Sequence, residues 1–501
     1  MNVNFRVDAS RRIGAGHMTR CLSLADALKA RGSRCRFLCR HVPAGLSAVI
    51  TAHGHELVRL GASAGSESHL TGARAAAFRE VSQEQDARES VAACAGNDID
   101  WVVVDHYGLD AVWERTLREL PIQVMAIDDL ADRPHECDVL VDQNLYADAN
   151  TRYRDLTSPQ CRLLLGPKYA MLREEFARAR DRVGVRSGPV RRILVSFGGV
   201  DATNGTAVAV EALRCLQLRD IYVDVVIGAE HPCRDEIVEL CKHAGFALHV
   251  QSTQMALLMS TADLGIGAGG SSTWERCCVG LPALACAVAD NQTRLVHDCA
   301  LAGALYAVAE PFNAESLSRH VRCLVENPML RQSISRSGMD LVDGRGTGRV
   351  LRALGAGAVH VRPAVLEDAR NLFEWRNHPV IREASRSKAP LEWAAHMHWL
   401  GTALGDPARM LLIGETTGRP IGVVRFDIAG TVAGVSIYTV PGHEQRGIGA
   451  DLLAAAEVWM ARHMPDVRSI NAEVLGDNAR SHWLFAGARY ERRFTVYAKS
   501  I

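Results

Sequence analysis

The sequence predicts an α/β protein built from three domains. Its 501 residues correspond to about three domains at roughly 150 residues each. Short apolar strands alternate with amphipathic helices through residues 1–330, a pattern typical of parallel sheets covered on both faces. The composition then shifts: no cysteine follows residue 323, whereas five of the eight tryptophans follow residue 350. We therefore expect two parallel-sheet domains joined to a third α/β domain of separate origin.

Two polar or glycine-rich stretches set the expected domain boundaries. The polar stretch 182–189 separates a first domain, residues 1–185, from a second domain, residues 186–345. The Gly/Ala-rich segment 346–357 is expected to be a linker, and residues 358–501 are expected to form the third domain.

Composition and charge exclude several classes of protein. Apolar residues make up 48% and charged residues 23%, which suits packed globular cores. Basic and acidic residues number 57 each, so no net field attracts polyanions, which argues against a nucleic-acid binder or a membrane-surface protein. The sequence shows no apolar run of about 18 residues and no secretory signal, and we expect a cytoplasmic location.

The cysteines and acidic residues do not suggest a metal centre. The fourteen cysteines are scattered without a C-x-x-C pair, so buried reduced thiols are expected rather than a zinc site. Asp128, Asp129 and Asp132 form an acidic run, but the sequence offers no further oxygen ligands for a cation. A metal-free site is therefore expected.

Apolar strands that end in turn residues locate the candidate site. Ligands of parallel sheets bind beyond the carboxyl ends of the strands, so the loops at those ends matter most. The strand-like runs are 101–105 and 124–128, which end in carboxylates, and 193–197, 223–227 and 263–267.

The loop Ile13–Arg20 leads into an amphipathic helix. Gly14 and Gly16 allow close backbone approach at a helix N-terminus, which favours an anion or a charged transition state. His17 follows directly and is the candidate base, with a purely structural histidine as the alternative. The third glycine of the dinucleotide fingerprint is missing, so this loop does not predict a dinucleotide site.

Two further loops belong to the second domain. Gly267–Glu275 follows a strand and opens a helix, as a phosphate-binding loop does, and helix capping by its hydroxyls is the alternative. We expect its contacts with a nucleoside diphosphate to come from Gly269, Gly270, Ser271 and Ser272, with Glu275 accepting hydrogen bonds from a ribose. The turn Ser196–Asp201, with Gly198 and Gly199, lies at the end of another strand and is either a binding loop or a plain tight turn.

Several of these motifs together resemble a known family. The N-terminal part is similar to the UDP-sugar hydrolases of pseudaminic-acid biosynthesis, which have a GT-B-like pair of Rossmann-type domains. The motifs that carry the resemblance, in chain order, are Phe5–Ser10, Ile13–His17, Arg20–Ala25, Ile127–Arg133, Asp142–Asn144, Gly166–Ala170, Ser196–Asp201, Gly269–Gly280 and Asp290–Gln292.

The resemblance implies hydrolysis of UDP-2,4-diacetamido-2,4,6-trideoxy-β-L-altropyranose to the free sugar and UDP. It places the catalytic base on His17 and UDP-sugar contacts on the glycine-rich loops, Arg20, Asn291 and Gln292, and we expect Asp8 to orient His17 or bind the sugar. Because a nucleoside diphosphate is a good leaving group, the reaction needs a positioned water and a base of near-neutral pKa but no general acid.

The third domain carries a second motif. The strand-like run 433–440 leads into Gln445–Ala450, which resembles the pyrophosphate loop of the GNAT acetyltransferases and implies acetyl-CoA as cosubstrate. Expected acetyl-CoA contacts are Tyr438, Thr439, Val440, Gln445, Arg446, Gly447, Ile448, Gly449, Ala450 and Asn478.

The acid and the base of acetyl transfer are left open by the sequence. Phe485 stands where many family members have a tyrosine that protonates the thiolate, so Tyr490, Tyr438 or a water is the alternative acid. Glu473 or Asp427 is the candidate base.

The two resemblances together imply a bifunctional enzyme of pseudaminic-acid biosynthesis. Residues 374–377 and the helix over 393–399 resemble the acceptor side of acetyltransferases that act on nucleotide sugars. The third domain would acetylate UDP-4-amino-4,6-dideoxy-N-acetyl-β-L-altrosamine, and the first two would hydrolyse the product. A GT-B glycosyltransferase, a non-catalytic nucleotide-sugar sensor and an acetyltransferase for a peptide amine are the alternatives. The oligomeric state is not predicted.

Overall fold

The described residues form three sheets, each the centre of one domain. The structure, a computed structural model, describes residues 1–10, 16–61, 81–216, 220–308, 312–355, 359–385, 387–416, 419–442, 448–474 and 478–492. These residues divide into two compact units, Met1–Ala356 and Gly357–Ile501, and each unit is described by itself.

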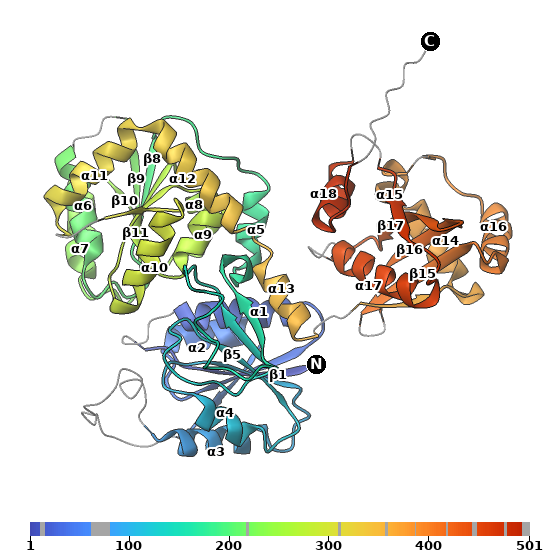
Figure 1. Ribbon diagram of the computed structural model, residues 1–501. Coiled ribbons are helices and arrows are strands. Elements are labelled where there is room, and N and C mark those ends of the chain that lie inside the picture. The colour runs from blue at the N-terminus through green and yellow to red at the C-terminus, as the bar shows by residue number, and fades with distance from the viewer. Residues whose placement is uncertain are drawn as a thin grey trace, which may run out of the picture. The chain divides into compact units, whose positions relative to one another are not determined.

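The first domain is a seven-stranded parallel sheet with the order β3-β2-β1-β4-β5-β6-β7. Helices α1 and α2 cover one face, and α3 and α4 cover the other, so that the apolar strands are buried on both sides (Figure 1). The strands are β1 Asn2–Val7, β2 Arg34–Cys39, β3 Glu56–Arg59, β4 Trp101–Asp105, β5 Gln123–Ile127, β6 Val139–Asp142 and β7 Arg162–Leu165, and the helices are α1 Gly16–Lys29, α2 Ala44–Ala52, α3 Gln83–Cys94 and α4 Ala111–Leu117.

The second domain repeats this plan with a six-stranded parallel sheet of order β10-β9-β8-β11-β12-β13. Helices α6, α7 and α11 pack on one face, and α8, α9 and α10 pack on the other. The strands are β8 Arg192–Ser196, β9 Tyr222–Ile227, β10 Ala247–Val250, β11 Leu264–Ala268, β12 Ala283–Cys286 and β13 Tyr306–Ala307. The helices are α5 Glu174–Arg180, α6 Gly205–Leu216, α7 Arg234–Ala244, α8 Met255–Thr261, α9 Ser272–Cys278, α10 Asp290–Leu301, α11 Ala314–Glu326 and α12 Pro328–Leu341.

Both parallel sheets change winding direction at a central pair of strands. In the first sheet β2 lies on one side of β1 and β4 on the other, and in the second sheet β9 and β11 flank β8 in the same way. Loops that leave the carboxyl ends of such a strand pair run in opposite directions and leave a crevice between them. The topology therefore places the loops after β1, β4, β8 and β11 at the expected binding positions.

The expected linker is largely helical, which corrects the sequence-based boundary. Residues Gly346–Ala353 form α13, which packs against α1 of the first domain. Val350, Leu351 and Leu354 are buried in the core of that domain. Their spacing gives one apolar helix face, and this face outweighs the low helix propensity of the surrounding glycines.

The second unit contains a five-stranded sheet of order β14-β15-β16-β17-β18. Neighbouring strands are antiparallel except β17 and β18, which are parallel. Helices α17 and α18 pack on one face, and α14 and α16 pack on the other. The elements are β14 His360–Pro363, α14 Ala369–Asn377, α15 Pro379–Glu383, α16 Trp393–Gly405, β15 Arg409–Thr416, β16 Arg419–Ala429, β17 Val432–Thr439, α17 Ile448–His463, β18 Ser469–Ala472 and α18 Ala479–Gly487.

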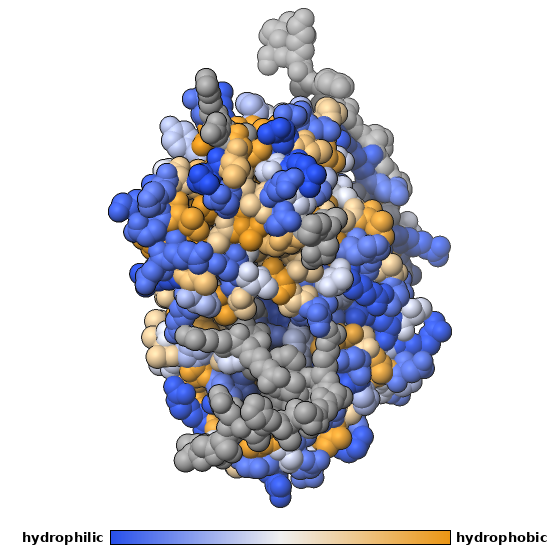
Figure 2. Space-filling view, turned by 90° about the vertical axis from the view of Figure 1, so that its left-hand side faces the viewer, coloured by the Kyte–Doolittle hydropathy of each residue, from blue (hydrophilic) through white to orange (hydrophobic). Residues whose placement is uncertain are grey.

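The surface is mixed in polarity, and the cysteines are mostly buried. On the face shown in Figure 2, hydrophilic and hydrophobic residues are interspersed. All fourteen cysteines are free thiols and most are buried. Among the described residues, no helix has the length and apolar character needed to cross a membrane, and no cluster of side chains has the composition of a metal site.

Candidate active site

His17 and Asp105 meet at the winding change of the first sheet. His17 lies in the first turn of α1, and Asp105 is the last residue of β4, the strand beside β1. His17 Nδ1 lies 2.5 Å from Asp105 Oδ1, and the two residues are 7% and 1% exposed. A histidine that donates from Nδ1 to a buried carboxylate keeps Nε2 as its basic nitrogen.

Arg20, one turn after His17, fixes the carboxylate of Asp105. Its Nε and Nη2 donate to the two oxygens of Asp105, each over 2.7 Å, and its Nη1 donates to Asp129 over 3.1 Å. Burial alone would raise the pKa of Asp105, but the charge of Arg20 and the hydrogen bonds from Arg20 and His17 hold it well below its usual range. Nη2 also lies 3.1 Å from His17 Nδ1, a longer contact than the one it makes with the carboxylate. Asp105 is therefore ionised and orients the imidazole.

Tyr107 links this group to the second domain. Its ring meets the ring of His17 edge-on, with centroids 4.6 Å apart. Its hydroxyl donates to Asp129 over 2.9 Å and accepts from Nδ2 of Asn291, on α10, over 3.3 Å. Burial and the charge of Asp129 raise the pKa of Tyr107, so the phenol stays protonated. Asn291, which is predicted from the sequence as a UDP-sugar contact, therefore lies near the group formed by His17 and Tyr107.

The two predicted glycine loops also meet. A Cβ placed on Gly16 would lie 3.4 Å from Oγ of Ser271, which follows β11. Gly198 has a φ of 97°, a conformation that favours glycine, and Gly199 packs against Gly228 after β9. The loops after β1 and β11 are therefore neighbours, and the β8 loop is tied to the end of β9.

Other predicted contact residues in the second domain have partners within the protein. Arg173 Nη2 lies 3.2 Å from Glu275 Oε1, and burial raises the pKa of Glu275 despite this contact. Gln292 Oε1 accepts from the backbone N–H of Val288 over 3.2 Å. A Cβ on Gly269 would collide with the side chain of Val296, so the loop needs glycine there.

Asp8 and Arg20 both have partners within the first domain. Asp8, expected to orient His17 or to bind the sugar, does not contact His17: it lies 2.9 Å from Arg6 and accepts the backbone N–H groups of Arg40 and His41. Arg20 was expected to bind the UDP-sugar, and its buried guanidinium is engaged by Asp105 and Asp129. Gly14 lies outside the described residues.

In the third domain, the strand expected to bind the cofactor pairs with β18 over only part of its described length. β17 pairs with β16 up to Thr439, whereas its described pairing with β18 runs only from Val432 to Val435. The backbone of Ser436–Thr439 is therefore not matched by β18 over the described residues, and it can polarise a thioester carbonyl or bind the cofactor arm. Gly449, at the start of α17, would place a Cβ 3.9 Å from Thr439. Ile448 and Ala450 lie in the same turn, and Val440 follows β17.

Of the remaining residues predicted to bind acetyl-CoA, three lie in a part of the chain that the structure does not describe, and one caps a helix. Gln445, Arg446 and Gly447 lie outside the described residues. Asn478 caps α18, because its Oδ1 accepts from the backbone N–H of Ser481 over 3.1 Å.

Tyr490 and Tyr438 are the candidate acids of acetyl transfer, and Phe485 stands in place of the usual tyrosine. Phe485 is buried in the core, and Tyr490 donates to Glu457 over 2.8 Å. Burial raises the pKa of Tyr438, despite the nearby charges of Arg376 and Arg425.

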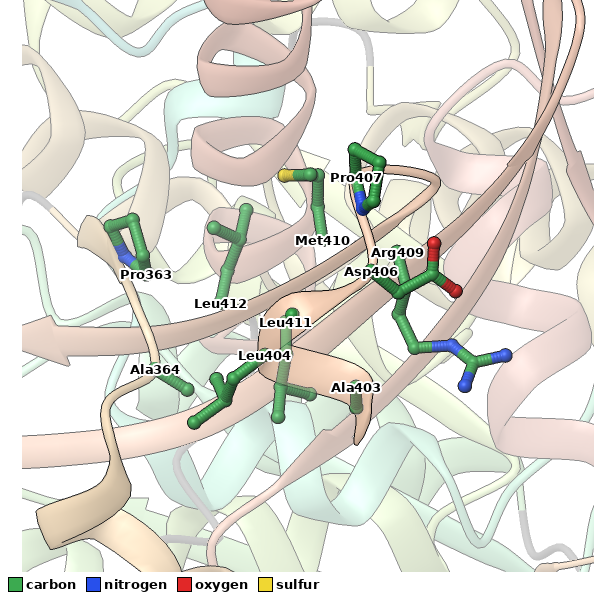
Figure 3. Close-up of a pocket in the computed structure, with 11 residues that line it drawn as sticks. Pro363, Ala364, Ala403, Leu404, Asp406, Pro407, Arg409, Met410, Leu411 and Leu412 are labelled. Carbon is green, nitrogen blue, oxygen red and sulfur yellow. The ribbon is translucent and has the colours of Figure 1, made fainter. Parts of the chain in front are cut away.

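A separate pocket of about 340 Å³ lies between α16 and β15. It is lined mainly by aliphatic residues such as Leu404, Leu411 and Leu412, with Asp406 and Arg409 to one side (Figure 3). None of the residues expected to bind acetyl-CoA lines this pocket.

Asp105 and Tyr107 were not predicted as site residues. One indication of Asp105 was present in the sequence, since it is a carboxylate that ends β4, the strand beside β1, and β1 precedes the helix that carries His17.

Family comparison assigns the third domain. Residues 369–487 match the Acetyltransferase (GNAT) family, so this part of the chain is a GNAT domain. With the two parallel-sheet domains, it confirms the expected α/β class, two Rossmann-type domains followed by a GNAT domain.

The N-terminal region resembles three curated proteins. An uncharacterized protein of Methanocaldococcus jannaschii is 24% identical over 344 residues, which cover 65% of this chain and 67% of that protein. The spore coat polysaccharide biosynthesis protein SpsG of Bacillus subtilis is 30% identical over 220 residues, 42% of this chain and 65% of its own. The UDP-2,4-diacetamido-2,4,6-trideoxy-β-L-altropyranose hydrolase of Campylobacter jejuni is 24% identical over 265 residues, 52% of this chain and 83% of its own.

Solved structures match each part separately. MurG of Acinetobacter baumannii is 15% identical, with a TM-score of 0.49, over 71% of this chain and 99% of that one. The aminoglycoside acetyltransferase AAC(6')-Ib with coenzyme A is 24% identical, with a TM-score of 0.25, over 28% of this chain and 87% of that one.

Proposed function

We propose that residues 1–355 hydrolyse UDP-2,4-diacetamido-2,4,6-trideoxy-β-L-altropyranose and that the GNAT domain makes this substrate by N-acetylation. The hydrolase assignment rests chiefly on one observation, the His17–Asp105 pair held by Arg20 at the winding change of the sheet. The resemblance to the Campylobacter jejuni hydrolase supports the choice of substrate.

In the proposed hydrolysis, His17 Nε2 takes a proton from a water that attacks the anomeric carbon. The bond between that carbon and the diphosphate oxygen breaks, and UDP leaves with the electron pair. Because UDP is a good leaving group, no acid is required on its side. Asp105 remains ionised and stabilises the imidazolium that forms.

In the proposed acetylation, the neutral 4-amine of UDP-4-amino-4,6-dideoxy-N-acetyl-β-L-altrosamine attacks the thioester of acetyl-CoA directly. The C–S bond breaks, coenzyme A leaves as the thiolate, and the amine loses a proton. The unmatched edge of β17 supports this role because its backbone can polarise the carbonyl oxygen. The GNAT match supports acetyl-CoA as the cosubstrate.

The hydrolase is tested with the diacetylated UDP-sugar alone. We expect UDP and free sugar from the wild type and a loss of about 100-fold or more in His17→Ala, the usual contribution of a general base. Release of UDP only after a sugar acceptor is added would instead identify a glycosyltransferase. Substrate binding with no UDP release under either condition would identify a nucleotide-sugar sensor.

A further inference from the structure

Cys137 and Cys161 bring two thiols into contact in the first domain. Their Sγ atoms lie 3.7 Å apart, although the residues are 24 positions apart in the chain. Cys137 lies just before β6 and is 2% exposed, whereas Cys161 directly precedes β7 and is half-buried. Other buried thiols donate to backbone carbonyl oxygens, as those of Cys35, Cys277 and Cys278 do. In this pair, one sulfur is the hydrogen-bond partner of the other.

The register of β6 and β7 explains why the two residues meet. The strands are parallel, with Val139 opposite Arg162, and the backbone N–H of Arg162 donates to the oxygen of Asp138 over 2.9 Å. Cys161 is therefore one step out of register with Cys137, and such diagonal neighbours on strands about 4.8 Å apart have Cα atoms roughly 6 Å apart. Disulfides span Cα distances of about 4.4–6.8 Å, so a bond between these sulfurs needs no separation of the strands. Both side chains also pack in the same core, beneath α3 and α4.

Cys161 is the more reactive of the two sulfurs. Solvent reaches its half-buried side chain, whereas Cys137 is enclosed. The hydrogen bond from Cys137 lowers the pKa of Cys161 despite burial, and the charge of His135 adds to this effect. Against the effect of burial, hydrogen bonds to Asp128 and Glu114 raise the pKa of His135 to about 9, so its ring is cationic at neutral pH. An accessible sulfur with a lowered pKa and a second sulfur beside it is typical of redox-sensitive cysteines.

The segment between the two cysteines contacts the second domain. Asn144 Oδ1 accepts from Nε1 of Trp274, on α9, over 3.1 Å. Asp148 Oδ1 lies 2.6 Å from Nη2 of Arg294, on α10. A covalent link between the two sulfurs would close this segment into a loop at its base, on the side of the sheet away from the contacts with α1.

We propose that Cys137 and Cys161 form a redox-sensitive dithiol, which a peroxide oxidises to an intramolecular disulfide that closes the segment 137–161. This chemistry is independent of the activities proposed for the two units. The Cys161 thiolate attacks one oxygen of hydrogen peroxide, the O–O bond breaks, and hydroxide leaves with the electron pair. The sulfur of Cys137 then attacks the sulfenic acid on Cys161, and the S–O bond breaks. Together the two thiols lose two electrons and two protons, and the peroxide is reduced to two waters.

Peptide mapping of the full-length chain tests the disulfide. The reduced protein is treated with hydrogen peroxide, its remaining thiols are alkylated, and it is digested with trypsin without reduction. Because Arg152 and Arg154 lie between the two cysteines, trypsin releases them on different peptides. We expect these peptides to be joined by a bond that dithiothreitol breaks. The bond should form at least about tenfold faster in the folded chain than in urea, since the fold holds the sulfurs in contact.

Two variants separate the roles of the sulfurs. Cys137→Ser removes the sulfur that resolves the sulfenic acid, so dimedone should label Cys161 at least about fivefold more than in the wild type. Cys215→Ser is the control, because Cys215 is exposed and its Sγ contacts Glu211 rather than a thiol. This variant should form the Cys137–Cys161 disulfide as the wild type does.

The disulfide should also raise the unfolding temperature of the first unit by about 2–6 °C, because closing the segment restricts the unfolded chain. The proposal is overturned if peroxide oxidises Cys215 while Cys137 and Cys161 stay reduced, or if the two are linked no faster in the folded chain than in urea. An unchanged unfolding temperature in the linked protein would overturn the closing of the segment by the disulfide.

Discussion

At the scale of single residues, the site depends on a carboxylate that does not touch substrate in the proposed reaction. Asp105 fixes the ring of His17, and Arg20 fixes Asp105 from the next turn of the same helix. His17 and Arg20 are three residues apart on α1, so both reach the end of β4 from one helix face. Asp105 is a positioning residue in this arrangement.

Asp105→Asn should lower kcat about 100-fold or more while KM changes less than about threefold. The amide cannot pair with Arg20 as a carboxylate does, and its N–H group can turn towards His17 and reverse the tautomer, which misorients the base without removing it. Steady-state hydrolysis of the diacetylated UDP-sugar measures the split. Asp26→Asn is the control, because Asp26 also pairs with histidines, His53 and His55, in the same domain. Equal losses in the two variants would contradict a specific role for Asp105.

The same substitution should change the pH dependence of stability. The pKa of Asp105 is lower in the folded protein than in the unfolded chain, so its ionised form contributes stability above a pH of about 4, and this contribution is lost as the pH falls. Asp105→Asn should remove that contribution and flatten the acid side of the stability curve. Thermal unfolding between about pH 3 and 7 measures the effect, and a parallel curve for wild type and variant would contradict it.

At the scale of elements, the sequence predicts the strands and their loops, but it does not predict which strands lie next to one another in the sheet. The Gly-x-Gly before His17 and the glycine-rich loop after β11 stand out in the sequence because such loops serve backbone approach to a ligand. Which carboxylate meets His17 depends on β4 lying beside β1, a crossover that spacing does not encode. For that reason Asp8, closer in sequence, was expected in the place that Asp105 holds.

The burial of charged side chains was the second feature that could not be predicted from the sequence. Arg276, in the short helix α9, would be expected at the surface, but it is buried because Gly265 and Gly267 of β11 leave room for its side chain. The glycines of 346–357 likewise suggested a linker, although three apolar residues were spaced to dock a helix. In both places packing between distant segments decided the outcome.

Helix α13 should contribute to the stability of the first unit. Leu351 is 2% exposed in the core beneath α1, so Leu351→Ala should cost about 2–4 kcal/mol through lost burial and a cavity. Leu301→Ala is the matched control, since Leu301 is 74% exposed on α10 and should cost less than about 0.5 kcal/mol. Scanning calorimetry of the full chain should show that Leu351→Ala lowers the unfolding temperature of the first unit and leaves that of the second unit unchanged. An unchanged thermogram for Leu351→Ala would mean that α13 does not support the first domain.

At the scale of the whole molecule, the two compact units are proposed to act one after the other on the same sugar. In this proposal, the GNAT domain adds an acetyl group to the sugar that the N-terminal unit then cleaves from UDP. Before acetylation the 4-amine is mostly protonated, and its charge opposes the positive charge that develops at the anomeric carbon as UDP departs. Acetylation removes that charge, so the chemistry itself favours acetylation first.

With the UDP-4-amino sugar as the only sugar substrate, UDP release should therefore depend on acetyl-CoA. Two unit charges about 4 Å apart interact by about 1–4 kcal/mol near a protein surface, so hydrolysis without acetyl-CoA should be at least about fivefold slower. Mass spectrometry should find free diacetamido sugar, UDP and coenzyme A from the wild type, whereas His17→Ala should stop at the acetylated UDP-sugar. Equal UDP release with and without acetyl-CoA would show that the N-terminal unit cleaves the amino sugar directly, and the proposed order of the two reactions would then be wrong.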